Sequence, residues 1–234
     1  MHGHEGHDCC KGHTTETVAN DPNAKALLQE AFDKTSRWGE TFPGITADLI
    51  LNQNGVEYKG TATIKSSKET EVTLAVGPEG EALLTWLKNQ VGMMAAHRAS
   101  RSFEESDGKY AITFDKELDL HPLGRQICIN GDGMNSRYRI QDGRIQQISR
   151  SMGKMRFTIN IVESMTTKDN KFLTTQYVVY YFTPEGQISN VENFTDTPVE
   201  ICGVYLPGTR RIISVENGEV IVRVLAFKNH KPIG

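Results

Sequence analysis

Several features that would point to a functional class are scarce or missing in this sequence. No apolar run approaches the ~18 residues that a membrane-spanning helix needs. The N-terminus has no apolar stretch typical of a secretory signal, which favours a cytoplasmic protein, with a shortened form of an exported protein as the alternative. The 26 lysines and arginines are outnumbered by 29 aspartates and glutamates, so the basic surface of a nucleic-acid-binding protein is not expected. Four cysteines in 234 residues give little support for a disulfide scaffold.

The sequence also contains no recognisable catalytic motif. A nucleophile elbow, a phosphate-binding loop and the H-E-x-x-H zinc motif are all missing. His121 and Asp132 would make an acid–base pair, but no local spacing holds them together, and His121-Pro122 is typical of a loop. We therefore expect a protein that is not an enzyme.

The chain begins with a segment that is rich in metal ligands and poor in residues that pack. Four of the seven histidines and two of the four cysteines lie in the first thirteen positions: His2, His4, His7, Cys9, Cys10 and His13. Imidazole and thiolate are the ligands that Zn, Ni and Cu prefer, although the spacing matches no rigid structural zinc site. We predict that residues 1–20 form a disordered tail that binds one of these metals. The alternative is a tail that binds metal only because His-rich peptides do so.

Two stretches carry the periodicity of amphipathic helices. Asp21-Pro22 is typical of a helix start, because an N-cap residue precedes a proline at the first helical position. Apolar residues then recur on one stripe to about Trp38-Gly39. A second stripe runs over about 81–100 and ends near His97-Arg98, where positive charge complements the helix dipole. Both helices are amphipathic enough to lie on a sheet.

Most of the remaining sequence alternates between apolar and polar residues, as half-buried strands do. The dipeptides Asn54-Gly55, Asp142-Gly143 and Asn217-Gly218 predict tight hairpin turns. The predicted strands cover 45–51, 56–64, 72–76, 109–115, 125–130, 136–141, 144–150, 155–163, 172–182, 187–194, 199–206, 209–216 and 219–228.

The pattern within individual strands predicts which faces are buried. Met155, Phe157, Ile159 and Ile161 alternate with polar residues, so we expect these four side chains to point into the core or a cavity. The segments 177–182 and 220–225 are apolar on both faces, and such strands are expected to be buried from both sides.

Together these elements predict a mainly β (α+β) fold in a single domain over 21–230. A sheet of more than ~10 strands curls or splits rather than staying flat. We therefore predict a large curled antiparallel sheet, or half-barrel, of about 11–13 strands wrapped around the two helices. Two helices do not fill so wide a concavity, so an apolar cavity of roughly 300–1,000 Å³ is expected. A two-sheet β-sandwich is the alternative.

Several short motifs occur together along the second helix and the strands that follow it: His97-Arg98, Phe103, Gly131-Asp132, Ser136, Tyr138 and Arg150-x-Met152-Gly153. With them, residues 24–228 resemble an uncharacterised domain family best known from photosynthetic organisms. That family has no established activity, so the resemblance implies no catalytic residue. More distantly, the first helix and the hairpin after it resemble those of periplasmic lipoprotein carriers and related lipid-binding half-barrels.

Side-chain chemistry indicates which residues bind a ligand. Arg98 and Arg150 carry guanidinium groups that suit a carboxylate or phosphate, and Tyr138 supplies a hydroxyl at the rim of a pocket. Methionines adapt to varied apolar ligands. The candidate ligand-binding set is His97, Arg98, Tyr138, Arg150, Met152, Met155 and Phe157.

Three functions remain open at this point. The first, which we favour, is a non-enzymatic carrier or binding protein for an apolar or amphipathic small molecule such as a lipid, with a metal-binding tail. The second is a metal-handling protein or assembly factor whose β domain docks a protein partner. The third is an enzyme with a pocket near His97, Arg98, Tyr138 and Arg150.

Overall fold

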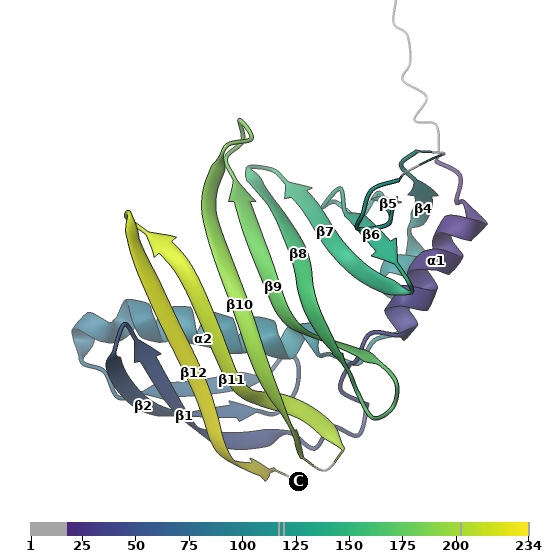
Figure 1. Ribbon diagram of the computed structural model, residues 1–234. Coiled ribbons are helices and arrows are strands. Elements are labelled where there is room, and N and C mark those ends of the chain that lie inside the picture. The colour runs from purple at the N-terminus through teal and green to yellow at the C-terminus, as the bar shows by residue number, and fades with distance from the viewer. Residues whose placement is uncertain (1–17, 117, 119, 202, 234) are drawn as a thin grey trace, which may run out of the picture.

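The computed structural model describes residues 18–116, 118, 120–201 and 203–233. Across these residues one antiparallel sheet of twelve strands curves around two α-helices (Figure 1). The predicted mainly β fold with a curled sheet is confirmed, and the two-sheet alternative is wrong. The helices are α1 (Pro22–Asp33) and α2 (Glu81–His97), and the strands are β1 (Ile45–Gln53), β2 (Val56–Ile64), β3 (Thr70–Leu74), β4 (Ala111–Phe114), β5 (Arg125–Asn130), β6 (Arg137–Gln141), β7 (Arg144–Met152), β8 (Met155–Thr166), β9 (Phe172–Phe182), β10 (Ile188–Ile201), β11 (Val204–Glu216) and β12 (Glu219–Pro232).

The strand order follows the chain with one exception. The order is β3-β2-β1-β12-β11-β10-β9-β8-β7-β6-β5-β4, so β1 and β12 are the only neighbours that are not consecutive in sequence. Leu51 of β1 lies opposite Leu225 of β12 in that pairing. The predicted turn at Asn54-Gly55 joins β1 to β2, and both residues have the positive φ angles, 49° and 92°, that a primed turn requires.

Both helices begin where the sequence predicts. The Asp21 side chain accepts hydrogen bonds from the N–H groups of Asn23 and Ala24, which caps α1. This helix ends at Asp33 rather than near Trp38, because the chain turns to meet β9, where the Ser36 N–H donates to the carbonyl of Phe172. No helix among the described residues is both long and apolar enough to cross a membrane.

Each helix covers one end of the concave face of the sheet (Figure 1). The buried residues of α2 pack on β1, β2, β3, β11 and β12, and those of α1 pack on β4, β5 and β6 together with Phe103. The first core contains Leu87, Val91, Met94, Leu49, Leu51, Leu206 and Leu225, and the second contains Leu28, Phe32, Ile112, Ile127 and Ile140. The two cores are separate, which leaves the middle of the sheet between them.

The middle strands β7–β10 are the least buried part of the sheet. Among their residues only Leu173, Val179 and Phe194 are buried. The prediction that 177–182 and 220–225 are buried from both sides is therefore wrong, and Val220 is 60% exposed. The physical reason is that both helices lie on the concave face, so no second layer covers the convex face.

The C-terminal half has fewer and longer strands than predicted. The three expected strands 187–194, 199–206 and 209–216 form only two, β10 and β11. Pro198 and Pro207, which suggest breaks in the sequence, lie opposite each other at a register shift between Thr197 and Pro198. A bulge is one of the positions in a sheet where a residue without an N–H is tolerated, so the strands continue through both prolines.

Candidate functional site

A group of aromatic side chains gathers where α2 meets the middle strands β8, β9 and β10. We call Trp86, Phe157, Tyr177, Tyr181 and Phe194 the central aromatic cluster. The rings of Tyr177 and Phe194 stack with their centroids 4.6 Å apart, and those of Phe157 and Tyr181 tilt towards each other at 6.3 Å. Phe194 is buried, whereas the other four side chains are only half-buried. Four of the five rings are therefore partly accessible to solvent.

The register of the sheet explains why these rings meet. Phe157 of β8 lies opposite both Arg150 of β7 and Tyr181 of β9, so these three residues form one row across the strands. Phe157 and Ile159 pack against the buried residues Val179, Phe194 and Ile212, as predicted from their alternation. Met155 has the same parity but lies at the β7–β8 turn with 48% of its surface exposed, so its predicted inward position is wrong.

An ion pair is buried beside the central aromatic cluster. The Nε and Nη2 atoms of Arg210 donate to the two carboxylate oxygens of Asp196 at 2.8 and 2.7 Å. Arg210 is only 5% exposed, and its guanidinium lies 5.5 Å from the centre of the Phe194 ring. Burial acts to lower the pKa of Arg210, but Tyr177 and Asp196 raise it by more, so the Arg210 guanidinium stays charged.

The C-terminal end of α2 reaches this region with two basic residues. Part of the His97 surface is exposed to solvent, while nearby protein atoms desolvate its ring. Burial lowers the pKa of His97 to about 4, helped by the charges of Arg210, Arg98, Arg101 and Arg150. Burial also lowers the pKa of Arg98 to about 10, with Asp196 opposing this shift and Arg210 adding to it. His97 therefore faces only positive charges, whereas Arg98 faces both the Asp196 carboxylate and the Arg210 guanidinium.

Arg150 and Tyr138 contact each other from neighbouring strands. The Arg150 Nη2 atom donates to the Tyr138 hydroxyl oxygen at 2.9 Å. Tyr138 is almost fully buried, and burial raises the pKa of its phenol, with Asp107 adding to the rise and Arg150 opposing it. The Nε atom of Arg150 and the hydroxyl oxygen of Ser136 are buried and have no hydrogen-bond partner among the described residues.

The segment after α2 and the segment after α1 add further charges. The guanidinium groups of Arg37 and Arg101 lie 3.7 and 5.7 Å from the centre of the Phe32 ring. Asp107 faces Arg101, Arg150 and Arg37. Burial raises the pKa of Asp107, while the three arginines oppose that rise. We call Arg37, Arg98, Arg101, Arg150 and Arg210 the arginine group.

The structure brings together some of the predicted ligand residues and separates others. His97, Arg98, Tyr138, Arg150 and Phe157 lie around the concave middle of the sheet. Met152 and Met155 lie instead on the exposed β7–β8 hairpin, with Met152 49% exposed. Arg101, Asp107, Asp196 and Arg210 were not predicted from the sequence. The first two come from the segment after α2 and the last two from β10 and β11, and only the fold brings these parts of the chain together.

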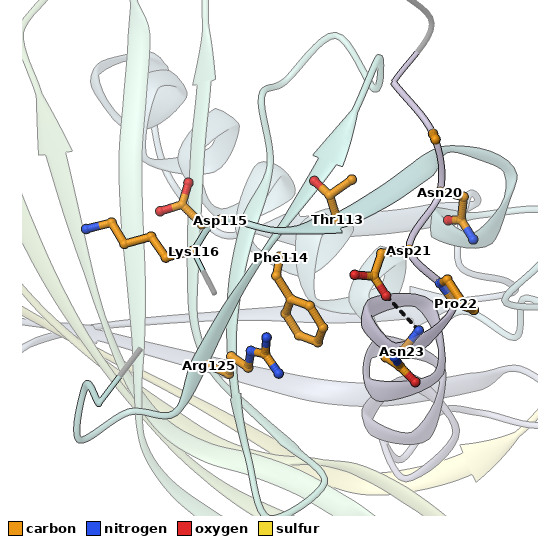
Figure 2. Close-up of a pocket in the computed structure, with 10 residues that line it drawn as sticks. Asn20, Asp21, Pro22, Asn23, Thr113, Phe114, Asp115, Lys116 and Arg125 are labelled. Carbon is orange, nitrogen blue, oxygen red and sulfur yellow. Dashed lines mark hydrogen bonds between the residues drawn. The ribbon is translucent and has the colours of Figure 1, made fainter. Parts of the chain in front are cut away.

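Two cavities differ from the predicted apolar pocket. The larger, about 680 Å³, is an open hollow between the start of α1 and the β4 edge, lined by residues such as Asn20, Asp21, Asp115 and Arg125 (Figure 2). It contains none of the predicted ligand residues. The smaller, about 20 Å³, lies between Trp38, Arg98 and Asp196 and has room for about one water molecule. A ligand on the central aromatic cluster would therefore lie outside both of these cavities.

The predicted metal ligands, His2, His4, His7, Cys9, Cys10 and His13, lie outside the described residues. Within the part of the chain that the structure describes, no group of three or more histidine, cysteine, aspartate or glutamate side chains is placed to hold a metal ion. The tail remains the metal site that the sequence predicts.

We expect deletion of residues 2–13 to abolish stoichiometric binding of Zn, Ni or Cu. Thermal stability in EDTA should stay unchanged, because a metal held by a tail contributes nothing to the folding of the sheet, whereas removal of a structural zinc unfolds a domain. Metal content by native mass spectrometry and melting curves of the full-length and shortened proteins measure both effects. Tight metal binding by the shortened protein would show that the metal site lies within residues 14–234 instead.

Fold and site together define an open antiparallel half-barrel whose concave face holds aromatic rings beside a group of arginines. The chain belongs to the family described as "Protein of unknown function (DUF3386)", whose sequence profile matches residues 19–233. The family resemblance seen in the sequence is thereby confirmed. No curated protein sequence matches the chain.

Two solved structures resemble the fold at low identity. A LolA superfamily protein from Nitrosomonas europaea has 11% sequence identity and a TM-score of 0.39, with 90% of this chain and 94% of that chain covered. A putative outer membrane lipoprotein-sorting protein domain from Vibrio parahaemolyticus has 8% identity and a TM-score of 0.39, with 89% and 92% covered.

Proposed function

We propose that the protein is a non-enzymatic binding or carrier protein for an amphipathic small molecule, which it holds on the concave face between α1 and α2. The observation that carries this proposal is the half-buried state of four of the five rings in the central aromatic cluster. A soluble domain usually covers such rings with a further layer of structure, and contiguous apolar surface left open is typical of a binding site.

The polar residues around the rings favour an amphipathic ligand over a purely apolar one. Arg150 lies in the same row as Phe157 and Tyr181. On the other side of the cluster, the Tyr181 hydroxyl donates to Glu192 at 3.0 Å, and the Arg223 guanidinium lies 4.4 Å from the centre of the Trp86 ring. An apolar body resting on the rings would therefore have polar groups within reach at both ends.

The proposal is tested with N-phenyl-1-naphthylamine, a neutral probe that fluoresces when it enters an apolar site. We expect saturable binding with one probe per chain, and displacement by a medium-chain fatty acid or alkyl phosphate. Native mass spectrometry of protein purified without added lipid should also show a bound mass. No saturable probe binding and no bound mass would contradict the proposal, and the concave face would then serve to dock another protein.

The substitution Phe157→Ala should weaken binding of the neutral probe about tenfold while costing only about 1 kcal/mol of stability. A fully packed phenylalanine would cost roughly 3–5 kcal/mol when truncated to alanine, but Phe157 is only half-buried. Urea unfolding gives the free energy of unfolding, and probe titration gives the affinity. Met155→Ala, on the exposed hairpin of the same strand, is the matched control and should change neither quantity.

A cost near 4 kcal/mol for Phe157→Ala, with probe binding unchanged, would contradict this prediction. It would show that the ring serves the core and that the ligand, if there is one, lies elsewhere on the sheet.

A further inference from the structure

We propose that the concave face contains a binding site for an oxyanion, formed by Arg101, Arg150 and Ser136 beside His97, and that it takes the phosphate, sulfonate or carboxylate group of an amphipathic ligand. This inference rests on the proposed function and specifies the ligand's head group. It also separates the arginines that would bind the ligand from those that serve the fold.

The first observation is an imbalance of charge within the arginine group. Arg210 is neutralised by Asp196 through two hydrogen bonds, and Arg98 lies close to the same carboxylate. Among the described residues, in contrast, no carboxylate forms an ion pair with Arg101 or Arg150. Asp107 faces both of these arginines, but it also faces Arg37 and is partly desolvated. The concave side near His97 therefore keeps an excess of positive charge.

The second observation is a pair of buried polar atoms that lack partners. The Nε atom of Arg150 and the hydroxyl oxygen of Ser136 make no hydrogen bond among the described residues, and Ser136 is only 1% exposed. The β6–β7 register pairs Arg137 with Ser149, so one step along the chain Ser136 comes opposite Arg150. A buried donor without a partner lowers the stability of the folded protein. An oxyanion would accept hydrogen bonds from both the Arg150 N–H and the Ser136 O–H.

The third observation is the electrostatic state of His97. A helix C-terminus ordinarily stabilises a positive charge, and His97 lies in the last turn of α2. Its pKa is nevertheless lowered to about 4, first by burial and then by Arg210, Arg98, Arg101 and Arg150. Burial is the larger cause and the four arginines add to it, so the charges that face His97 are positive and favour an anion that enters.

The geometry also connects the anion site to the apolar site. Arg150 lies opposite Phe157, and Phe157 lies opposite Tyr181 of the central aromatic cluster. A head group between Arg101 and Arg150 would thus leave its apolar tail directly on the rings. The planar guanidinium fork binds carboxylate, sulfonate and phosphate oxygens in pairs, which makes arginine the fitting residue for such a group.

The test compares two probes with the same apolar body, the anionic 1-anilinonaphthalene-8-sulfonate and the neutral N-phenyl-1-naphthylamine. We expect the protein to bind the anionic probe at least about tenfold more tightly, since charge-assisted hydrogen bonds contribute at least this much. Arg101→Gln and Arg150→Gln should each reduce this preference severalfold and leave the neutral probe's affinity unchanged. Arg211→Gln, an exposed arginine on the opposite face of β11 from Arg210, is the control and should keep the preference.

The outcomes separate the two proposals. Equal affinity for the two probes would overturn the oxyanion site and leave the proposed function standing, whereas binding of neither probe would overturn both. Because the Arg101 side chain is exposed, Arg101→Gln tests the site even if Arg150→Gln fails to fold. Displacement of the anionic probe by inorganic phosphate would indicate a site for free anions, and displacement by decyl phosphate alone would indicate a lipid head group. Displacement by neither compound would overturn the site.

Discussion

Asp196→Ala is expected to destabilise the protein by about 3–5 kcal/mol, the largest loss we predict for a single substitution. The carboxylate receives two hydrogen bonds from Arg210, and both side chains are almost fully withdrawn from water. Removing the carboxylate leaves the Arg210 guanidinium buried without its partner. Arg98 loses its nearest opposing charge at the same time.

Urea unfolding monitored by tryptophan fluorescence measures this loss. The double variant Asp196→Leu/Arg210→Met removes both charges of the pair, so we expect it to recover most of the stability, as replacement of a buried ion pair by apolar residues commonly does. Glu69→Gln, in an ion pair with Lys65 on the surface, should leave stability unchanged. A loss as small for Asp196→Ala as for Glu69→Gln would show that water reaches the pair and that Arg210 is free to bind a ligand.

Local chemistry was enough to predict most of the secondary structure. Asp21-Pro22 specifies the start of α1, because its carboxylate and the missing proline N–H both suit the first turn of a helix. The predicted strands 125–130 and 172–182 coincide with β5 and β9. The number of strands and the length of the chain then imply a curved sheet, since a flat sheet of that width is not stable.

The candidate site was predictable only in part. Arg150 was found because its guanidinium suits an anion, and Phe157 because the alternation along its strand assigns it to the buried face. The hairpin register then places the two residues opposite each other. Arg101 and Arg210 were missed, because they are more than a hundred residues apart in sequence and meet only through the pairing of distant strands. An arginine such as Arg210 gives no local sign that it is buried, since its burial depends on Asp196, which lies across the β10–β11 turn.

The sequence pattern of each strand also does not predict how much of the concave face the two helices cover. The sequence implied an apolar cavity, but whether the helices leave the centre open depends on where each docks on the sheet. Those positions follow from two separate cores, one around Leu87 and one around Leu28. Between these cores Phe157, Tyr177 and Tyr181 are only half-buried, and neither of the two cavities described above is the apolar pocket that we predicted.

Below pH 6.5, wild-type protein is expected to lose stability relative to His97→Gln, by about 1–2 kcal/mol at pH 4 after allowance for solvent screening of the exposed ring. The pKa of His97 is about 4 in the folded protein and 6.5 in a model peptide. Between these values the unfolded chain binds more protons, so stability is fully present above pH 6.5 and declines as the pH falls towards 4. The charges that face the ring are Arg210 on β11, Arg98 at the end of α2, Arg101 in the segment after it and Arg150 on β7.

The comparison with His97→Gln is needed because two carboxyl groups act in the opposite direction. Burial raises the pKa values of Asp107 and Glu192, so each carboxyl contributes stability that increases as the pH falls. The difference between the urea-unfolding free energies of wild type and His97→Gln, measured from pH 4 to 8, cancels these contributions. If the difference between the two unfolding free energies stays constant from pH 4 to 8, water screens His97 from the arginines. The prediction is met if the difference between the two unfolding free energies grows below pH 6.5. If saturating 1-anilinonaphthalene-8-sulfonate then reduces this difference, the bound anion neutralises the positive charges around His97, because the negative charge of the anion restores the affinity of the ring for a proton.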